Sequence, residues 1–217
     1  MTSVFEENYL KAIHKLCEKN EVGAYTNDIA HELNIKPASV SESLKKLSDK
    51  NLIFYTKYKA VTLTKQGQLI ALKTIRKHRL WEVFLVEKLG FKWDEIHPMA
   101  EELEHISFDV LIERLSEFLG DPEFDPHGDP IPDKNGKIKA NKSVKLSAAS
   151  KNVSLTMTGI ENDSPAFLQH LNKLGLALGI KLMIMESVDF DKSILVKVGE
   201  DKEFYLSYDI ASNILCR

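Results

Sequence analysis

Residues 26–51 read TNDIAHELNIKPASVSESLKKLSDKN and predict two short helices joined by a tight turn, because apolar residues recur at helical spacing on both sides of one break. Thr26 is a suitable N-cap for the first helix, and Asn34 can take the left-handed conformation that ends it. Pro37 fits the first turn of the second helix. The segment therefore indicates a helix-turn-helix.

The flanking segments extend this motif. From Val4 to Lys19, apolar residues again recur at helical spacing, so an amphipathic helix precedes the pair. From Leu52 to Thr64 the period changes to two, with many aromatic and β-branched residues, which is typical of a β-hairpin. This order of elements predicts a winged helix over residues 1–66, in which the second helix of the pair enters the major groove of DNA.

The middle of the chain, residues 67–132, is predicted to be helical and to end in a loop. Helical periodicity runs from Thr64 to a stop near Gly90, resumes from Pro98 to Ile106, and returns from Phe108 to Gly120. The following stretch, residues 121–132, contains so many prolines and glycines that it excludes helix and strand alike, and it marks a domain edge.

The last part of the chain is predicted to form a small β-barrel of the SH3 kind over residues 153–217, preceded by a flexible polar linker over residues 133–152. Short strands are expected at 153–160, 181–188, 194–198 and 203–206, and a helix is expected at 164–174. The fold class is therefore mainly α with a small β domain at the C-terminal end.

Charge is distributed unevenly along the chain. The net charge is −3, yet residues 1–77 hold 13 Lys+Arg against 8 Asp+Glu, a net of +5, which leaves −8 for the remainder. This asymmetry suits a head that binds a polyanion and a body that binds cations.

Because no stretch is apolar and long enough to cross a bilayer, and the N-terminus lacks the pattern of a signal peptide, we expect a cytoplasmic location without membrane contact. Cys17 and Cys216 form no CxxC, so no disulfide framework or thiolate zinc site is indicated.

Histidine and glutamate residues give the strongest chemical signal. They fall into two groups at helical spacing, each on one helix face, and an antiparallel helix pair would bring both groups around one or two cations. A single pair of His and Glu residues on one helix face usually lies on the solvent-exposed surface. Six such residues at helical spacing favour a metal site instead. Oxygen and imidazole donors without thiolate favour Mn²⁺ or Fe²⁺. The candidates are His78, Glu82, His97, Glu101, Glu104 and His105.

Five motifs together carry a resemblance to a known family. They are ENYLKAI at 7–13, PASVSESL at 37–44, LTKQG at 63–67, EELEH at 101–105 and DPHGDP at 125–130. With them, the chain resembles the diphtheria toxin repressor family, closest to its manganese-responsive branch, over essentially its whole length. The resemblance implies a metal-dependent repressor of metal-uptake genes that binds double-stranded operator DNA as a homodimer. It also implies a central helical domain for dimerisation and metal binding, and a FeoA-like C-terminal barrel.

The resemblance also assigns ligands position by position, and implies up to two ions per chain. The first set is His78, Glu101, Glu104 and His105. Iron-type relatives have Cys at the position of Glu101, which favours Mn²⁺. The second, ancillary set is His78, Glu82 and His97. Asp163 falls near the place where a carboxylate of the barrel can complete this second site.

Two positions depart from the family pattern. Asn8 stands where the family has Met or Asp as a ligand, and Lys11 replaces a Glu that binds metal in some manganese-type members. An Asn carbonyl still coordinates a hard cation but brings no charge, whereas a protonated Lys cannot coordinate one. Glu6 and Glu7 are substitutes if the first helix is rotated.

Eight residues of the winged helix are candidates for DNA contact. Small and polar side chains at the start of the recognition helix favour base readout, and lysines favour phosphate contacts. The readout candidates are Ala38, Ser39, Ser41 and Glu42. The phosphate candidates are Lys45, Lys46, Lys57 and Lys59.

Two alternatives remain open at this point. Glu102 and His105 form an E-x-x-H motif, as in di-metal carboxylate enzymes, but those four-helix bundles need the motif twice and only one copy exists here, so we expect no enzyme. The other alternative is a winged-helix regulator that metal does not control. A metal titration of DNA binding distinguishes this regulator from a metal sensor.

Overall fold

A computed structural model of the chain describes residues 2–20, 22–140, 142–199 and 202–217. The chain divides into two compact units, each built from three segments. Unit 1 comprises Met1–His78, Glu101–Leu115 and Pro132–Ile138, and unit 2 comprises Arg79–Ala100, Ser116–Ile131 and Lys139–Arg217. Both units therefore contain parts of the central helices.

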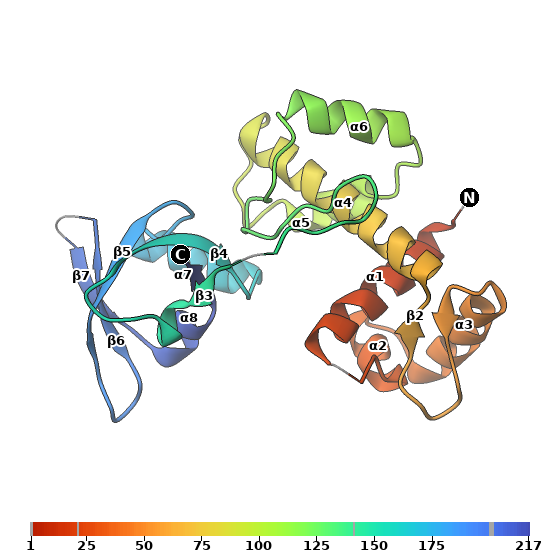
Figure 1. Ribbon diagram of the computed structural model, residues 1–217, viewed down its shortest axis with the longest axis horizontal. Coiled ribbons are helices and arrows are strands. Elements are labelled where there is room, and N and C mark those ends of the chain that lie inside the picture. The colour runs from red at the N-terminus through yellow and green to blue at the C-terminus, as the bar shows by residue number, and fades with distance from the viewer. Residues whose placement is uncertain (1, 21, 141, 200–201) are drawn as a thin grey trace. The chain divides into compact units, whose positions relative to one another are not determined.

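Unit 1 contains the predicted winged helix (Figure 1). Its helices are α1 (Val4–Lys19), α2 (Thr26–Glu32) and α3 (Pro37–Asp49), and its wing is the antiparallel pair β1 (Ile53–Phe54) and β2 (Thr62–Leu63). The apolar faces of the helices close over one core with the wing, which explains why apolar residues recur at helical spacing there. The largest fully buried side chains of this core are Leu10, Ile13, Ile29, Leu44 and Leu47.

The turn between α2 and α3 follows the sequence signals with one exception. Asn34 has a φ of 52°, which is the predicted left-handed conformation, and Pro37 is in the first turn of α3. The prediction that Thr26 caps α2 is wrong, because Thr26 is already helical and the capping position belongs to Tyr25, which makes no side-chain cap hydrogen bond. The preceding helix α1 has a complete capping box, since Ser3 and Glu6 satisfy each other's backbone N–H groups.

Three helices form the central region: α4 (Lys65–Glu87), α5 (His97–Leu103) and α6 (Asp109–Phe118). Thr64 fixes the start of α4, because its hydroxyl donates to the carbonyl of Leu52 at 3.1 Å and accepts from the amide of Gly67 at 3.1 Å. Gly67 must be glycine, since a Cβ there would lie 2.0 Å from the Leu52 oxygen. Gly90 and Gly120 have φ values of 72° and 78°, and they end α4 and α6 as predicted.

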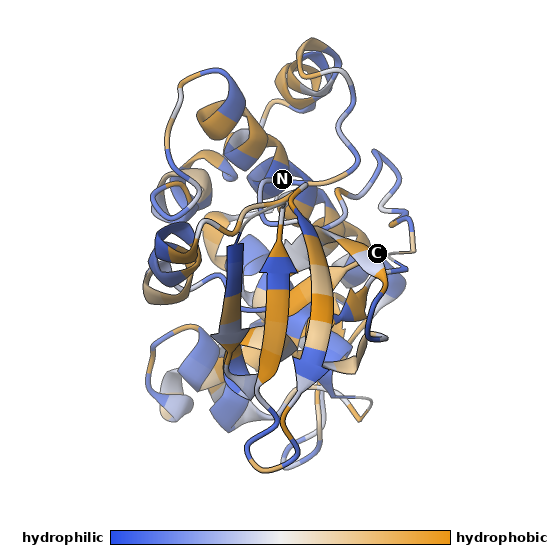
Figure 2. Cartoon of the chain, turned by 90° about the vertical axis from the view of Figure 1, so that its left-hand side faces the viewer, coloured by the Kyte–Doolittle hydropathy of each residue, from blue (hydrophilic) through white to orange (hydrophobic). Residues whose placement is uncertain are grey.

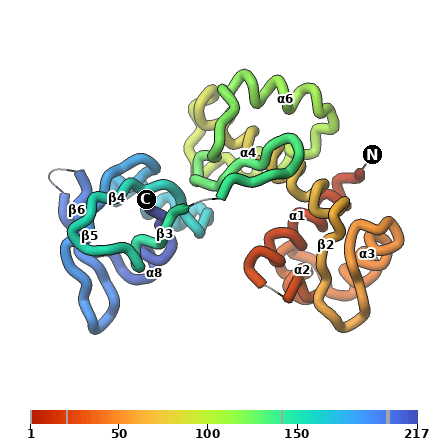
Figure 3. Tube along the Cα trace, in the orientation of Figure 1, coloured from red at the N-terminus to blue at the C-terminus, as the bar shows by residue number. Residues whose placement is uncertain are grey.

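The C-terminal barrel lies within unit 2 and is built on one antiparallel sheet in the order β3-β8-β4-β5-β6-β7. Its strands are β3 (Val144–Lys145), β4 (Ser154–Ile160), β5 (Lys181–Ser187), β6 (Ile194–Val198), β7 (Lys202–Leu206) and β8 (Ile214–Cys216). Hydrophobic and hydrophilic bands alternate along the strands in Figure 2, as expected when one face is buried. Figure 3 traces the chain as it returns through β4, β5 and β6. Two helices belong to the same domain, α7 (Pro165–Leu174) and α8 (Tyr208–Ser212).

The barrel begins earlier in the sequence than predicted, because β3 at Val144–Lys145 is part of its sheet. Strand β3 lies inside the stretch expected to be a linker and pairs with β8, and the 3-10 turn Leu146–Ala148 places Leu146 in the barrel core. Helix α8 and strand β8 were not predicted. Cys216 on β8 is fully buried, and burial raises the pKa of its thiol to about 12, so it acts as a small apolar side chain.

Candidate metal centre

Glu104 is the centre of a buried cluster in unit 1. Its side chain is 1% exposed, and its Oε2 lies 2.6 Å from Nδ1 of His78 on α4 and 2.6 Å from Nζ of Lys11 on α1. The Lys11 ammonium is also 3.3 Å from Nδ1 of His78. One carboxylate oxygen therefore joins α1 and α4 to the end of α5, as the sequence predicted for His78 and Glu104.

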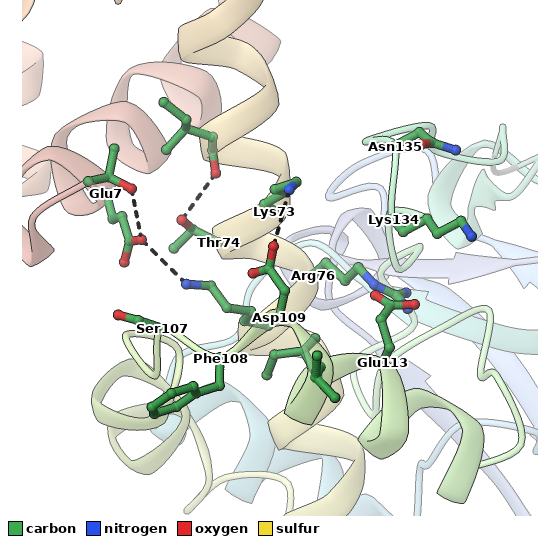
Figure 4. Close-up of a pocket in the computed structure, with 15 residues that line it drawn as sticks. Glu7, Lys73, Thr74, Arg76, Ser107, Phe108, Asp109, Glu113, Lys134 and Asn135 are labelled. Atoms are coloured by element: carbon green, nitrogen blue, oxygen red, sulfur yellow. Dashed lines mark hydrogen bonds and ion pairs between the residues drawn. The ribbon is translucent and has the colours of Figure 1, made fainter.

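A second carboxylate, Glu7, continues the cluster. Its Oε2 lies 2.8 Å from Nδ1 of His105, and its Oε1 accepts from Lys77 at 3.4 Å. Glu7 and Lys77 also line a pocket of about 770 Å³ within unit 1, which gives this carboxylate access to solvent. Figure 4 shows Glu7 at one side of that pocket and Lys73 facing Asp109 within it.

The electrostatics of Glu104 favour its charged form. Burial alone would raise the pKa of this carboxyl group, but the hydrogen bond from His78 and the positive charge of Lys11 outweigh burial and hold the pKa below its ordinary value. A carboxylate that stays ionised in a buried place, beside two imidazoles, is a suitable donor set for a divalent cation with a preference for oxygen and nitrogen ligands. Among the described residues, the free cysteines Cys17 and Cys216 belong to no cluster of His, Cys, Asp and Glu side chains that could hold a metal ion.

The structure places the remaining predicted ligands of this first site differently. Asn8 is half-buried on α1, next to Glu7, and Glu101 is exposed on α5. The carboxylate of α1 that reaches His105 is Glu7, which the sequence offered only as a substitute. Glu6, the other substitute, instead forms an ion pair with Lys50 and caps α1 with Ser3.

Unit 2 holds a second cluster around Glu82, which is 2% exposed on α4. The carboxylate lies 3.7 Å from Nδ1 of His97 at the start of α5, and 3.7 Å from Nδ1 of His127. Glu82, Asp125 and His127 are all buried, and each offers a ligand atom within 4.8 Å of the other two. The helical spacing predicted Glu82 and His97 but not Asp125 and His127, which belong to the DPHGDP motif at 125–130.

The carboxylate of Asp125 accepts hydrogen bonds from the backbone of its own loop, residues 125–130. Oδ1 of Asp125 accepts from the amides of His127 at 2.8 Å and Asp129 at 3.0 Å, while its Oδ2 lies 3.4 Å from Nε of Arg79. The ring of His127 stacks on Trp93 and uses Nε2 to bind the Trp93 carbonyl oxygen at 2.9 Å. This leaves Nδ1 of His127 directed at Glu82.

The predicted contribution of Asp163 has no counterpart in this cluster. Asp163 is exposed in the segment before α7, and it is absent from the metal-capable groups of the residues that the structure describes. Its role as a ligand stays a prediction from the resemblance.

The buried carboxylates Glu82 and Asp125 lie close to each other and to the half-exposed Asp129 in this second cluster, and this proximity shifts the pKa of Asp125 and of His127. Burial and the neighbouring charges of Glu82 and Asp129 raise the pKa of Asp125 to about 7. Burial would lower the pKa of His127, but the carboxylates of Glu82 and Asp125 raise it to about 9. The cluster therefore favours additional positive charge.

A pH dependence follows for the protein in the presence of a chelator. His127 binds its proton more tightly in the folded chain, with a pKa of about 9 against an ordinary 6.5. Its contribution to stability is therefore fully present below pH 6.5 and is lost as the pH rises through 9. Asp125 acts in the same direction, with its contribution lost as the pH rises through about 7. Thermal unfolding between pH 6.5 and 9 is expected to show a falling midpoint, with a shallower slope in His127→Asn; equal slopes would contradict this assignment.

The candidate DNA-contact residues lie on the recognition helix α3 and the wing. All are exposed except Ser41, which is half-buried, so their side chains are accessible. Lys46 forms an ion pair with Glu42 one turn earlier at 2.7 Å. Between the wing strands, Tyr58 is 88% exposed with a φ of 66°, and Nζ of Lys57 lies 4.8 Å from its ring centre. Apolar residues at Val40, Leu44 and Leu47 bury the opposite face of α3.

Comparison with known proteins matches all three parts of the chain. Residues 1–61 match the iron-dependent repressor N-terminal DNA-binding domain, and residues 64–133 match the iron-dependent repressor metal-binding and dimerisation domain. Residues 144–217 match the FeoA domain. A solved manganese-dependent transcriptional repressor in complex with manganese is 33% identical and superposes with a TM-score of 0.86, covering 97% of this chain and 98% of that chain. The chain belongs to the diphtheria toxin repressor family.

Two mycobacterial members of the family illustrate the range of similarity. The iron-dependent repressor IdeR of Mycobacterium tuberculosis is 32% identical over 126 residues, which are 58% of this chain and 54% of the relative. The chain thus spans about half the length of that relative. IdeR of Mycobacterium leprae is 30% identical over 159 residues, or 73% of this chain and 67% of the relative. The predicted fold class and family are confirmed.

Membership of the diphtheria toxin repressor family also bears on the enzyme alternative. The family consists of transcriptional repressors, which agrees with the expectation that the single E-x-x-H motif is not catalytic. Among the helices of the described residues, none is long and apolar enough to cross a membrane.

Proposed function

We propose that this chain is a metal-activated repressor that binds double-stranded operator DNA as a homodimer and controls metal-uptake genes. Its relatives include repressors named as iron-dependent and manganese-dependent, which supports Mn²⁺ or Fe²⁺ as the activating ion. The observation that carries the proposal is the buried Glu104 carboxylate, which connects α1 of the winged helix to His78 of α4.

The proposed ligands form two sets, for up to two ions per chain. The first set takes the sequence-predicted residues and adds the α1 carboxylate that reaches His105: His78, Glu101, Glu104, His105, Asn8 and Glu7. The second set starts from the predicted residues Glu82 and His97 and adds Asp125 and His127, with Asp163 as a carboxylate from the barrel. The sequence-based expectation that His78 also serves the second ion stays a prediction.

Control of DNA binding follows from the position of α1. One face of this helix carries Glu7 and Lys11, whereas Leu10 and Ile13 on another face are fully buried in the core of the winged helix. The bound cation supplies positive charge that attracts the carboxylates of separate helices. We propose that these carboxylates then hold α1 in one position, so that the two heads of a dimer keep the spacing that operator DNA requires. The cost of ordering the heads is met before DNA binds.

We propose that the start of α3 and the wing make the contacts with DNA. The start of α3 presents exposed small and polar side chains to base edges, and lysines of α3 and the wing contact phosphates. The proposed set is Ala38, Ser39, Ser41, Glu42, Lys45, Lys46, Lys57 and Lys59. As a DNA-binding regulator the protein would act in the cytoplasm.

A second copy of the chain is the proposed partner of the central helices. Around the start of α6, Phe108 is 73%, Val110 is 69% and Leu111 is 42% exposed, and such neighbouring apolar side chains favour contact with another protein surface. The match to a dimerisation domain over residues 64–133 supports this partner. We propose the sequence-based division of labour, with DNA binding in residues 1–66 and dimerisation and metal binding in residues 67–132.

A metal titration of DNA binding tests the proposed function. Operator sequences are selected from random duplex DNA in the presence of Mn²⁺, and affinity is then measured by fluorescence anisotropy with Mn²⁺, with Fe²⁺ under anaerobic conditions, and with chelator. We expect metal to increase the affinity by about 5- to 150-fold, the usual range of coupling between two sites. Affinity that neither metal nor chelator changes would establish instead a winged-helix regulator without metal control.

A further inference from the structure

Lys11 places a positive charge among the side chains proposed to bind the first ion. Its ammonium group lies 2.6 Å from Oε2 of Glu104 and 3.3 Å from Nδ1 of His78, and the lysine side chain is 22% exposed. We propose that Lys11 is a tethered competitor of the metal: its ammonium and the divalent cation compete for the Glu104 carboxylate, so Lys11 sets the metal concentration at which the first site fills. This inference rests on the proposed function, and it names one residue that determines the metal concentration needed to activate DNA binding.

Geometry prevents the two cations from sharing Glu104 as it stands. A cation bound to both Oε2 of Glu104 and Nδ1 of His78 would lie beside an ammonium that is already within 2.6 Å of the same oxygen. Two positive charges this close repel strongly where water is largely excluded, and the Glu104 side chain is only 1% exposed. The metal therefore has to displace Lys11, and the loss of its charge-assisted hydrogen bond weakens metal binding.

The displaced lysine has a route to water. Its side chain is already partly exposed, and a flexible four-carbon stem allows the ammonium to move outward while its methylene groups stay packed. Glu104 has no comparable freedom, because it is held by His78 as well as by Lys11. The competition is therefore decided by movement of Lys11 rather than of the carboxylate.

The charges of the whole cluster agree with this role. Glu7 and Glu104 contribute two negative charges, and Lys77 and Lys11 contribute two positive charges at 3.4 Å and 2.6 Å from them. Glu7 and Lys11 are four residues apart on α1, so both lie on the same face of the helix. The protein's own lysines thus neutralise the carboxylates that a metal would otherwise neutralise, and Lys11 is the one at the buried carboxylate.

The test measures metal affinity rather than DNA binding. Binding of Mn²⁺ to the full chain is followed by the electron paramagnetic resonance signal of the free ion, for the unmodified protein and for Lys11→Met, which keeps the length and apolar packing of the stem. Because a charge-assisted hydrogen bond is removed as a competitor, we expect one binding step to tighten by about tenfold or more. Lys11→Arg keeps the charge and is expected to show no such gain.

Lys15→Met is the matched control, because Lys15 lies one turn further along α1 and pairs with Glu32 at 2.7 Å, outside the cluster. Circular dichroism and thermal unfolding establish that each variant is folded. The inference is overturned if Lys11→Met binds Mn²⁺ no more tightly than the unmodified protein, or if Lys15→Met shows the same gain. If DNA binding still responds to Mn²⁺ in that case, the proposed function survives; if no variant binds Mn²⁺ at all, both fail.

Discussion

Replacing Glu104 with glutamine is expected to raise the Mn²⁺ concentration needed for DNA binding by about a hundredfold or more, since even residues that only support metal ligands change affinity by about 10- to 100-fold. The Glu104 carboxylate lies within hydrogen-bonding distance of His78, at 2.6 Å, and it is buried. The amide has nearly the same shape but no charge. The metal therefore loses its central anionic ligand while the fold keeps its volume.

Glu102→Gln is the matched control for this substitution. Glu102 lies on α5, two residues before Glu104 in the sequence, but it is exposed. We expect its replacement to leave the Mn²⁺ response within about a factor of two, because exposed charges contribute little. Anisotropy titrations of labelled DNA measure both variants. An unchanged midpoint in Glu104→Gln would remove Glu104 from the metal site.

The second large effect is expected from Gly128→Ala. Gly128 has a φ of 88°, and a Cβ there would lie 2.1 Å from the carbonyl oxygen of Thr158 and 2.4 Å from Cα of Gly159 on β4. The loop that carries Asp125 and His127 must therefore move away from the barrel strand. We expect a loss of about 3 kcal/mol or more in the stability of unit 2, from backbone strain and steric overlap together.

Gly120→Ala separates these two causes. Gly120 has a similar φ of 78°, but nothing lies within 4 Å of the position of its Cβ. Its replacement carries only the backbone penalty, about 1 kcal/mol. Thermal and denaturant unfolding compare the two variants with the unmodified chain. Equal losses in both would mean that the steric overlap of the added Cβ with β4 costs no stability beyond the backbone penalty.

Regular elements were predictable from local signals. Residues Val4–Lys19 form α1 as predicted, because their apolar residues mark one face over four turns, and Asn34, Gly90 and Gly120 end helices where their backbone preferences indicate. Strand β8 and helix α8 were missed because elements of three and five residues are too short to show a period. Strand β3 was missed because two exposed residues gain their conformation only from pairing with β8.

Only part of the candidate metal centre was predictable, because helical spacing is a local signal and the packing of helices and loops is not. His78 and Glu104 were found because helical spacing fixes which residues share a face. The partners Glu7, Lys11 and Lys77 depend on how α1 packs against α4, which no local pattern records. Asp125 and His127 lie in an irregular loop, where spacing predicts nothing about direction. The proline and glycine signals gave the loop its position, but not the side chains it would present.

Helix α1 has a practical consequence for building hybrid regulators. Leu10 and Ile13 belong to the interior of the DNA-reading head, while Glu7 and Lys11 on the same sixteen residues belong to the cation-responsive cluster. No cut in the polypeptide separates sensing from reading. A chimaera with a foreign head would have to interleave two parental sequences along a single helix, choosing the source of each position by the direction in which it faces.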